Sequence, residues 1–285
     1  MRQAPTSARQ PPDVLSGADR FLSVPCSIVL RKFRLRASGG TTMKRLLALL
    51  AITLMAVIGT TTMTAGAASA TSADWAWPGQ RFLVDIGNNT TKSCSVGYPG
   101  TDSAGNRYFI TAGHCFRTSS GNHYVNRGRS GLDVFGPNDT STSIGWEKLY
   151  ANLNDEGYYL DISLVQMRPG KRLRGYGWPD IPARESVSRV GDSACAVGQR
   201  HNESTCGEVT AVGTEIRMSG YPWKSIVNRA TYCSFPGDSG GLVYNNSGIL
   251  GIVSAGPRDT CNDSYVPIAA ALRSIRTSIP TFRLV

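Results

Sequence analysis

Residues 236–241 read Pro-Gly-Asp-Ser-Gly-Gly, a polar turn in which three glycines surround one serine and one acid. A serine that acts as a nucleophile must stand exposed on a tight turn, beside backbone N–H groups aimed at the oxygen that becomes negative. Glycine permits such a turn and leaves space next to it. Glycine-rich turns with a serine are also common in ordinary loops, so this stretch alone leaves both interpretations open.

Two further stretches place a histidine and an acid beside apolar segments. Residues 109–115 read Phe-Ile-Thr-Ala-Gly-His-Cys, a predicted strand that leads into a small-residue turn presenting His114. Residues 159–165 read Tyr-Leu-Asp-Ile-Ser-Leu-Val, so that Asp161 interrupts an apolar strand. A buried carboxylate needs a partner, and a histidine N–H is one. Taken singly, His114 also fits a surface or core histidine, and Asp161 an edge-strand acid that faces water.

Together, and in the order His, Asp, Ser, the segments TAGHC, LDISLV and PGDSGG resemble the three signature segments of chymotrypsin-like serine peptidases. The order differs from that of subtilisins and α/β-hydrolases, which share the chemistry on other folds. The segments 195–207 and 233–239 are similar to those of the compact secreted bacterial members, streptogrisin and α-lytic protease. The resemblance covers roughly residues 80–280. It implies an all-β chymotrypsin-like fold of two six-stranded antiparallel β-barrels with the active site between them.

The resemblance also implies a role for each matching residue. Ser239 would be the nucleophile, His114 the general base, and Asp161 the acid that orients the imidazole. The backbone N–H groups of Gly237 and Ser239 would form the oxyanion hole. Ser254 would support the triad acid and begin one wall of the substrate pocket. The other expected pocket residues are Tyr232, Phe235, Pro236, Ala255 and Gly256. The implied activity is hydrolysis of peptide bonds in a protein or peptide substrate through an acyl-enzyme, without a metal or organic cofactor.

The expected pocket departs from the trypsin-like pattern. Cys233 occupies the position six before Ser239, where an acid would select basic side chains. We therefore expect a largely apolar pocket and an apolar residue before the scissile bond. Asp259 and Asp263 lie near enough in the sequence to alter that preference.

The loop around the nucleophile departs from the bacterial pattern as well. Ala196 stands where the relatives carry an arginine that pairs with the acid before the nucleophile, here Asp238. Arg200, from the same loop, is the candidate substitute. The long pro-region of those relatives is also expected to be absent. These departures keep open a second hypothesis, a peptidase-fold binding protein with little or no turnover, and a third, an esterase that uses the same triad.

The N-terminal part has the pattern of an export signal. Residues 46–58 are uncharged and apolar, Met43-Lys44-Arg45 precedes them, and Ala68-Ser69-Ala70 follows. A basic start, a short apolar run and an A-x-A site are typical of a secretory signal peptide. The run has 13 residues, whereas a membrane span needs about 20; an uncleaved signal anchor is the alternative. We expect residues 43–70 to be the signal peptide and residues 1–42 to be a mis-assigned or discarded extension.

Charge and cysteine content change once residues 1–70 are set aside. This segment holds nine of the 30 basic and two of the 20 acidic residues, so the net charge of +10 falls to about +3. We therefore expect no nucleic-acid partner, no membrane attachment after signal cleavage, and a monomer. Cys26 is removed with the segment, which leaves six cysteines, an even number suited to an oxidising extracellular location. The simplest pairing joins neighbours: Cys94 with Cys115, Cys195 with Cys206, and Cys233 with Cys261. A zinc site is the competing interpretation, although no C-x-x-C pair is present.

Short apolar segments separated by Gly, Pro, Asn and Ser favour an all-β barrel or sandwich. The predicted strands are Arg81–Ile86, Tyr108–Thr111, Ser143–Trp146, Ile162–Met167, Ser193–Val197, Gly207–Val212, Ser225–Thr231, Gly241–Tyr244 and Ile249–Ser254. A short helix is expected at about 267–277, after Pro267. The peptidase domain would span 71–285, with a first barrel at about 80–170 and a second at about 180–265. The stretch 168–182 would be the linker between them or a long surface loop.

Overall fold

The computed structural model describes most of the chain after residue 75. The described residues are 76–87, 90–118, 120–124, 131–150, 158–172, 181–200, 204–218, 221–257 and 260–285. All of them belong to one compact unit, Ala65–Val285. The expected signal peptide, the extension before it, Cys26, Asp259 and the middle of the expected linker lie outside the described residues.

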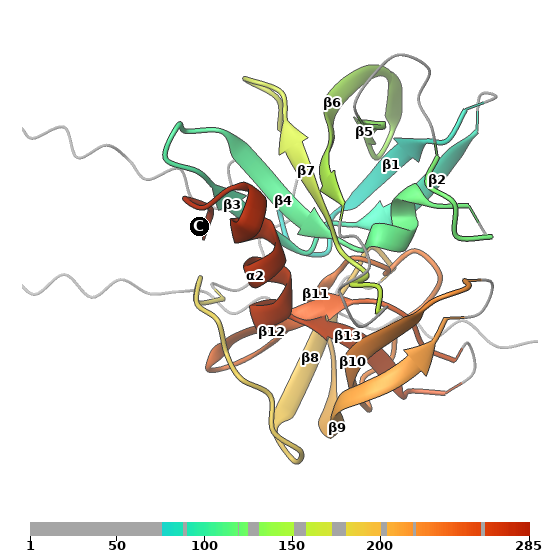
Figure 1. The fold of residues 1–285 in the computed structure, drawn as a ribbon, viewed down its shortest axis with the longest axis vertical. Coiled ribbons are helices and arrows are strands. Elements are labelled where there is room, and N and C mark those ends of the chain that lie inside the picture. Colours follow the sequence, from blue (N-terminus) through green and yellow to red (C-terminus); the bar gives the residue numbers. More distant parts are fainter. Residues whose placement is uncertain are drawn as a thin grey trace, which may run out of the picture. The chain divides into compact units, whose positions relative to one another are not determined.

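The described regular structure is mainly β-strand, with one α-helix near the C-terminus (Figure 1). The first group of strands is β1 (Arg81–Asp85), β2 (Thr91–Ser95), β3 (Tyr98–Thr101), β4 (Arg107–Thr111), β5 (Asp133–Gly136), β6 (Asp139–Tyr150) and β7 (Ser163–Met167). The second is β8 (Ser193–Val197), β9 (Thr205–Arg217), β10 (Lys224–Ala230), β11 (Leu242–Asn245), β12 (Gly248–Val253) and β13 (Asp263–Pro267). The remaining elements are the 3-10 helix η2 (Gly113–Phe116), the α-helix α2 (Ile268–Ser278) and the strand β14 (Arg283–Leu284).

The strands form two curled antiparallel sheets, which lie one above the other in Figure 1. The second sheet is a closed six-stranded barrel in the order β10-β13-β12-β11-β8-β9, as expected. The first needs a correction, because it has eight strands in the order β14-β3-β4-β7-β6-β5-β1-β2. Gly97 lies between β2 and β3, where a side chain would collide with the Ile252 side chain and the backbone of Ile110, so only glycine fits there. The C-terminal β14 then adds to the edge of β3.

All nine predicted strands overlap observed strands, and the helix begins one residue after Pro267. Sequence reasoning missed β2, β3, β5, β13 and β14. Two of these have poor strand composition, since β2 reads TKSCS and β3 reads YPGT. Proline and glycine are depleted in strands, so local preference indicated a loop. Their neighbours β1 and β4 supply the backbone pairing that makes them strands.

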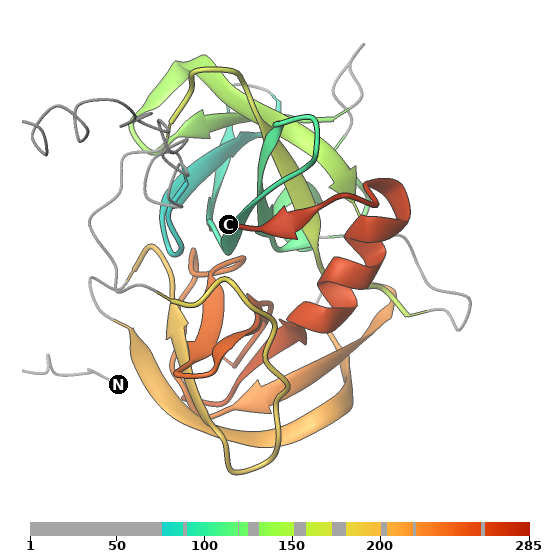
Figure 2. The ribbon, with the colours of Figure 1, turned by 90° about the vertical axis from the view of Figure 1, so that its left-hand side faces the viewer.

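A shared apolar cluster joins the two sheets and the helix α2. The cluster includes Ile110 and Leu164 from the first sheet, Leu242 and Ile252 from the second, and Leu272 from α2, all fully buried. Figure 2 shows α2 beside both sheets, with β14 returning to the first. Because protein interiors are packed as densely as crystals, this contact sets the position of one sheet against the other. Residues at the junction therefore keep a defined geometry.

Three disulfides join sequential neighbours among the described cysteines: Cys94 with Cys115, Cys195 with Cys206, and Cys233 with Cys261. The first closes η2 onto β2, the second links β8 to β9, and the third links the two segments that flank the candidate pocket.

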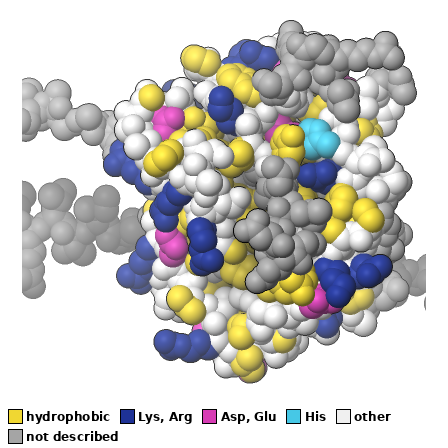
Figure 3. All heavy atoms as spheres, viewed as in Figure 1, with side chains coloured by type: hydrophobic (Ala, Val, Ile, Leu, Met, Phe, Trp, Pro, Cys, Tyr) yellow, Lys and Arg dark blue, Asp and Glu magenta, His cyan; other side chains and the backbone are white. Residues whose placement is uncertain are grey.

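On the face drawn in Figure 3, lysine and arginine side chains are spread among hydrophobic and uncharged ones.

Candidate active site

The histidine lies on a single 3-10 turn, η2, directly after the buried strand β4. A side chain at Gly113 would collide with the Tyr159 hydroxyl, so only glycine fits before His114. The next residue, Cys115, is tied to β2 by its disulfide with Cys94. These contacts hold the histidine backbone in place at the end of the strand.

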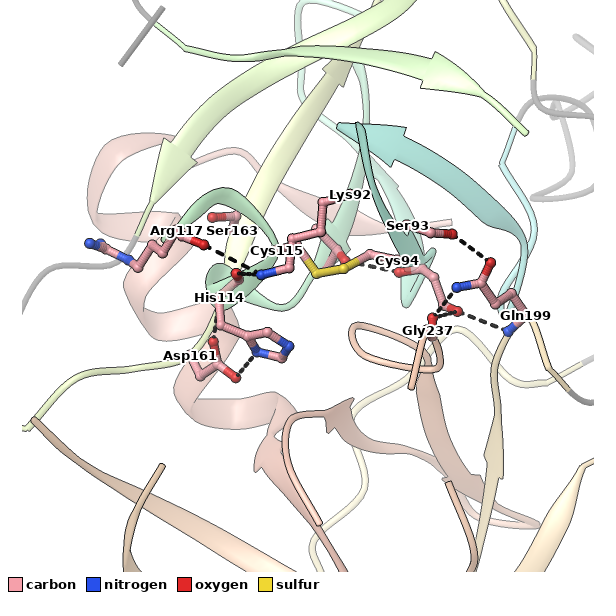
Figure 4. Close-up of a disulfide and its surroundings, with 12 residues drawn as sticks. Lys92, Ser93, Cys94, His114, Cys115, Arg117, Asp161, Ser163, Gln199 and Gly237 are labelled. Atoms are coloured by element: carbon pink, nitrogen blue, oxygen red, sulfur yellow. Dashed lines mark hydrogen bonds and ion pairs between the residues drawn. A yellow bond between two sulfur atoms is a disulfide. The ribbon is translucent and has the colours of Figure 1, made fainter. Parts of the chain in front are cut away.

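Lys92 supports the same turn, and sequence reasoning missed it. Its Nζ donates to the backbone oxygen of His114 at 2.6 Å and to that of Arg117 at 3.4 Å (Figure 4). Burial lowers the pKa of Lys92, and the negative charge of Asp161 opposes this by raising it. Cations commonly bind the last carbonyl groups of a helix in this way. Nothing in the local pattern of β2 indicated the contact, because His114 lies far along the chain.

Asp161 lies fully buried behind the imidazole of His114. Its Oδ2 is 2.8 Å from the ring nitrogen Nδ1, and its Oδ1 accepts from the His114 backbone N–H at 2.7 Å. The Ser254 hydroxyl donates to the same Oδ2 at 2.6 Å. An ionised carboxylate can only accept hydrogen bonds, so it holds a proton on Nδ1 and leaves Nε2 as the acceptor of the ring.

The pKa of Asp161 reflects two opposing effects. Burial raises the pKa, because desolvation disfavours the charged form. The charge and hydrogen bonds of His114, together with the Ser254 hydroxyl, outweigh burial and hold the pKa below its ordinary value. Asp161 is therefore ionised at neutral pH, and its charge can stabilise a protonated imidazole.

Ser239 stands between two glycines with left-handed backbone, Gly237 at φ 109° and Gly240 at φ 84°. Residues with side chains rarely adopt such angles, so the glycines allow this turn. The Ser239 carbonyl accepts from the Ser95 backbone N–H at 2.8 Å, which links the nucleophile turn to β2. The turn is thus anchored to both sheets.

Asp238, the acid before the serine, is buried and accepts from backbone donors. Its Oδ2 accepts from the Phe235 N–H and its Oδ1 from the Arg200 N–H, both at 2.8 Å. The Arg200 side chain donates through Nε to the Pro236 carbonyl at 3.2 Å. Arg200, the candidate substitute for the arginine replaced by Ala196, therefore contacts this loop through its backbone and its side chain.

A second set of side chains orients the peptide group that follows. The Gly237 carbonyl accepts from Gln199 Nε2 at 2.6 Å and from Ser95 Oγ at 2.8 Å. Ser93 Oγ donates to Gln199 Oε1 at 2.7 Å and so orients the amide (Figure 4). This clamp, Ser93, Ser95 and Gln199, joins β2 to the loop after β8, and the sequence analysis did not single it out.

Two backbone donors remain available beside Ser239. The N–H groups of Gly237 and Ser239 donate to no other group among the described residues. The Pro236 carbonyl is turned toward Arg200, and in a trans peptide the N–H of the next residue points the opposite way. The Gly237 N–H is therefore directed away from Arg200, and these two donors could bind an anionic oxygen.

His114 and Ser239 line the same cleft, which has a volume of about 270 Å³. The contacts of the described residues include no hydrogen bond between their side chains. Five of the six expected pocket residues line the cleft. The lining besides His114 and Ser239 consists of Met218, Tyr221, Ser234, Phe235, Pro236, Val253, Ser254, Ala255, Gly256 and Pro257.

Tyr232 is the correction to the expected pocket. It is fully buried in the core of the second barrel, where its hydroxyl donates to the Ser264 carbonyl at 3.2 Å. Its ring packs against Tyr265, with 6.4 Å between the centroids, and Tyr232 does not line the cleft. Tyr221 lines the cleft instead, with its ring edge-on to His114 at 6.3 Å. Its position on the loop after β9 has no fixed spacing from the motifs, so sequence reasoning missed it.

The described part of the chain contains no group of three His, Cys, Asp or Glu side chains placed to hold a metal ion. None of its helices combines the length and the apolar character that crossing a membrane requires.

The family model named Trypsin matches residues 91–277 of the chain. Streptogrisin-C of Streptomyces griseus is 31% identical over 185 residues, which are 62% of this chain and 36% of the relative. Serine protease 1 of Streptomyces fradiae is 32% identical over 162 residues, 56% of this chain and 41% of the relative. The chain thus matches less than half the length of either relative.

Solved structures agree in fold. Thermobifida fusca protease A matches with a TM-score of 0.50 and 22% identity, over 73% of this chain and 97% of that one. A glutamic acid specific serine protease matches with a TM-score of 0.52 and 22% identity, over 73% of this chain and 99% of its own. At this identity the likeness concerns the fold alone.

Proposed function

The chain belongs to the trypsin family of serine peptidases, and we propose that it is a secreted serine endopeptidase with His114, Asp161 and Ser239 as its catalytic triad. The observation that carries the proposal is the hydrogen-bonded series from Ser254 through Asp161 to the imidazole, which faces a cleft shared with Ser239. Buried carboxylates need such partners, and this one has an imidazole whose Nε2 has no hydrogen-bond partner among the described residues.

In the proposed reaction, Ser239 Oγ attacks the carbonyl carbon of the scissile peptide bond while Nε2 of His114 accepts its proton. The imidazole becomes positively charged, and the Asp161 carboxylate stabilises that charge. The tetrahedral intermediate collapses when His114 gives the proton to the leaving amine. Water then attacks the acyl-enzyme, His114 accepts a proton from it, and the acid product leaves as Ser239 regains its hydrogen.

The oxyanion of each intermediate would accept hydrogen bonds from the Gly237 and Ser239 N–H groups. Loss of one such donor typically costs about 2.7–4 kcal/mol of transition-state stabilisation. The donors act without reorganisation when their peptide groups are already fixed, and the contacts of Arg200 and Gln199 support that condition. An apo cleft often lacks the bond between serine and histidine, which tightens when substrate binds.

Substrate and location are also part of the proposal. The substrate is a protein or peptide, and the apolar lining of the cleft favours a side chain with an apolar stem before the scissile bond. Three disulfides among the described cysteines support an oxidising, extracellular location. The proposed enzyme acts as a monomer without metal, cofactor, nucleic acid or membrane attachment.

A fluorophosphonate probe tests the catalytic proposal directly. We expect labelling of the full chain, loss of labelling in Ser239→Ala, and strong reduction in His114→Ala, with all three proteins showing cooperative unfolding. A folded protein that is not labelled would instead support the peptidase-fold binding protein. Parallel assays on matched ester and amide substrates separate a peptidase from an esterase, since only the peptidase hydrolyses both at appreciable rates.

A further inference from the structure

A buried carboxylate lies directly behind the candidate pocket. Asp263, the first residue of β13, is 1% exposed. Its Oδ2 accepts from the Ser234 backbone N–H at 2.6 Å. Its Oδ1 has no hydrogen-bond partner among the described residues. Ser234 lines the cleft, so this acid is one residue removed from the place where substrate would bind.

The absence of a side chain at Gly256 lets the Asp263 Oδ1 lie close to the wall of the cleft. Gly256 also lines the cleft, and a Cβ at this position would overlap Asp263 Oδ1 and Cγ. The carboxylate therefore fills the space in which a side chain at position 256 would begin. No side chain of that residue separates the oxygen from the wall of the cleft.

Among the described residues, no side chain acts as a dedicated counterion for Asp263. Burial and, to a lesser extent, the negative charge of Asp238 raise its pKa, which lies at about 6 once all neighbours act. The hydrogen bonds from Ser234 and the charge of Arg229, on the adjacent strand β10, lower it. No ion pair to Asp263 is found in the described part of the chain. Tyr232 is the other titratable neighbour of Asp263. Burial raises the pKa of its phenol well above the ordinary value, and the charge of Asp263 raises it as well.

An uncompensated buried carboxylate is unfavourable unless a cation or further donors reach it. A substrate side chain entering the cleft could supply both. The lining offers apolar surface from Met218, Val253 and Ala255 along the way, which suits a long aliphatic stem. Lysine and arginine combine such a stem with a cationic group of several donors.

We propose that Asp263 makes this pocket selective for a lysine or arginine side chain before the scissile bond, with the cationic group facing the carboxylate across the Gly256 wall. This inference rests on the proposed endopeptidase function and replaces the apolar residue expected from the sequence with a basic one. The acid missing at Cys233 is supplied by the first residue of β13, two positions after Cys261, the disulfide partner of Cys233.

Matched peptides test this assignment. They differ only before the scissile bond and carry arginine, its neutral isostere citrulline, or methionine. At pH 8 we expect kcat/KM for arginine to exceed that for citrulline roughly tenfold to hundredfold, the range of a charge-assisted hydrogen bond. In Asp263→Asn the ratio should fall to near one, while methionine cleavage changes little. The buried acid Asp102 lies in the turn between β3 and β4, where it accepts from the Tyr108 hydroxyl. It provides the matched control Asp102→Asn, in which the ratio is retained.

Binding separates this proposal from the catalytic one. Calorimetry with the Ser239→Ala variant compares the arginine and citrulline peptides without any turnover. Tighter binding of arginine, declining as pH falls through about 6, supports the role of Asp263. Equal binding of the two peptides overturns it, even if the wild-type enzyme is labelled by fluorophosphonate. An unlabelled wild-type protein with preserved arginine selectivity overturns the catalytic proposal alone.

Discussion

Removal of the Ser254 hydroxyl tests how the buried Asp161 carboxylate is stabilised. Ser254 is 3% exposed and donates to Asp161 Oδ2 at 2.6 Å. A hydrogen bond to a charged group contributes about 1.5–3 kcal/mol, and a neutral one about 0.5–1.5 kcal/mol. We therefore expect Ser254→Ala to lower the free energy of unfolding at pH 7 by about 1.5–3 kcal/mol.

The pH dependence of this loss is the decisive part. The pKa of Asp161 is lowered in the folded protein, so its ionised form contributes stability above the unfolded pKa, and that contribution disappears as pH falls through the folded pKa. The difference between Ser254→Ala and wild type should accordingly be constant from neutral pH to about pH 5. Below that it should shrink, as the carboxyl becomes protonated.

Urea unfolding at a series of pH values measures this effect. Ser225→Ala is the matched control, because Ser225 is equally buried and donates at 2.7 Å to a neutral acceptor, the Tyr159 carbonyl. We expect its loss of stability to be smaller and independent of pH. If both variants lose the same free energy with the same pH profile, Asp161 does not rely on Ser254 and the account of its lowered pKa is wrong.

Other predictions follow from neighbouring contacts. Gln199→Leu removes one of the two side-chain donors to the Gly237 carbonyl. It should lower kcat for amide substrates roughly two- to tenfold, with little change in KM. An unchanged kcat would show that the Ser95 hydroxyl alone holds this peptide group. Replacing Cys94 and Cys115 by serine should reduce the free energy of unfolding by about 2–4 kcal/mol, measured by urea titration. A variant as stable as the wild-type protein would mean that packing alone holds η2 in place. Gly240→Ala should abolish activity and lower the melting temperature. The φ of Gly240 is 84°, and a Cβ there would collide with the Thr111 side chain and the Ser95 backbone. A fully active variant would refute the need for glycine at this position. Hydrolysis should also fall on acidification, because a protonated imidazole cannot act as a base, and a flat profile from about pH 5 to 8 would exclude a histidine base.

The chemistry-bearing residues could be predicted because each is embedded in a short local pattern. Gly237 and Gly240 predict the turn at Ser239. An apolar strand interrupted by Asp161 indicates a carboxylate that needs a partner. The even number of cysteines likewise indicated disulfides, and the simplest pairing, between sequential neighbours, is the one observed. Residues whose roles depend on contacts distant in the chain left no such pattern, and Lys92, Gln199 and Tyr221 were missed for that reason.

The sequence by itself determined an all-β chain with a histidine, an acid and a serine in the order of the chymotrypsin-like peptidases, because turn residues and apolar alternation act over a few positions. Only the tertiary structure decided which groups surround them. It placed the Ser254 hydroxyl on the Asp161 carboxylate, moved Tyr232 into the core, and brought Asp263 behind Gly256. Those outcomes depend on how two sheets pack against each other, and packing joins residues whose separation in the chain carries no signal.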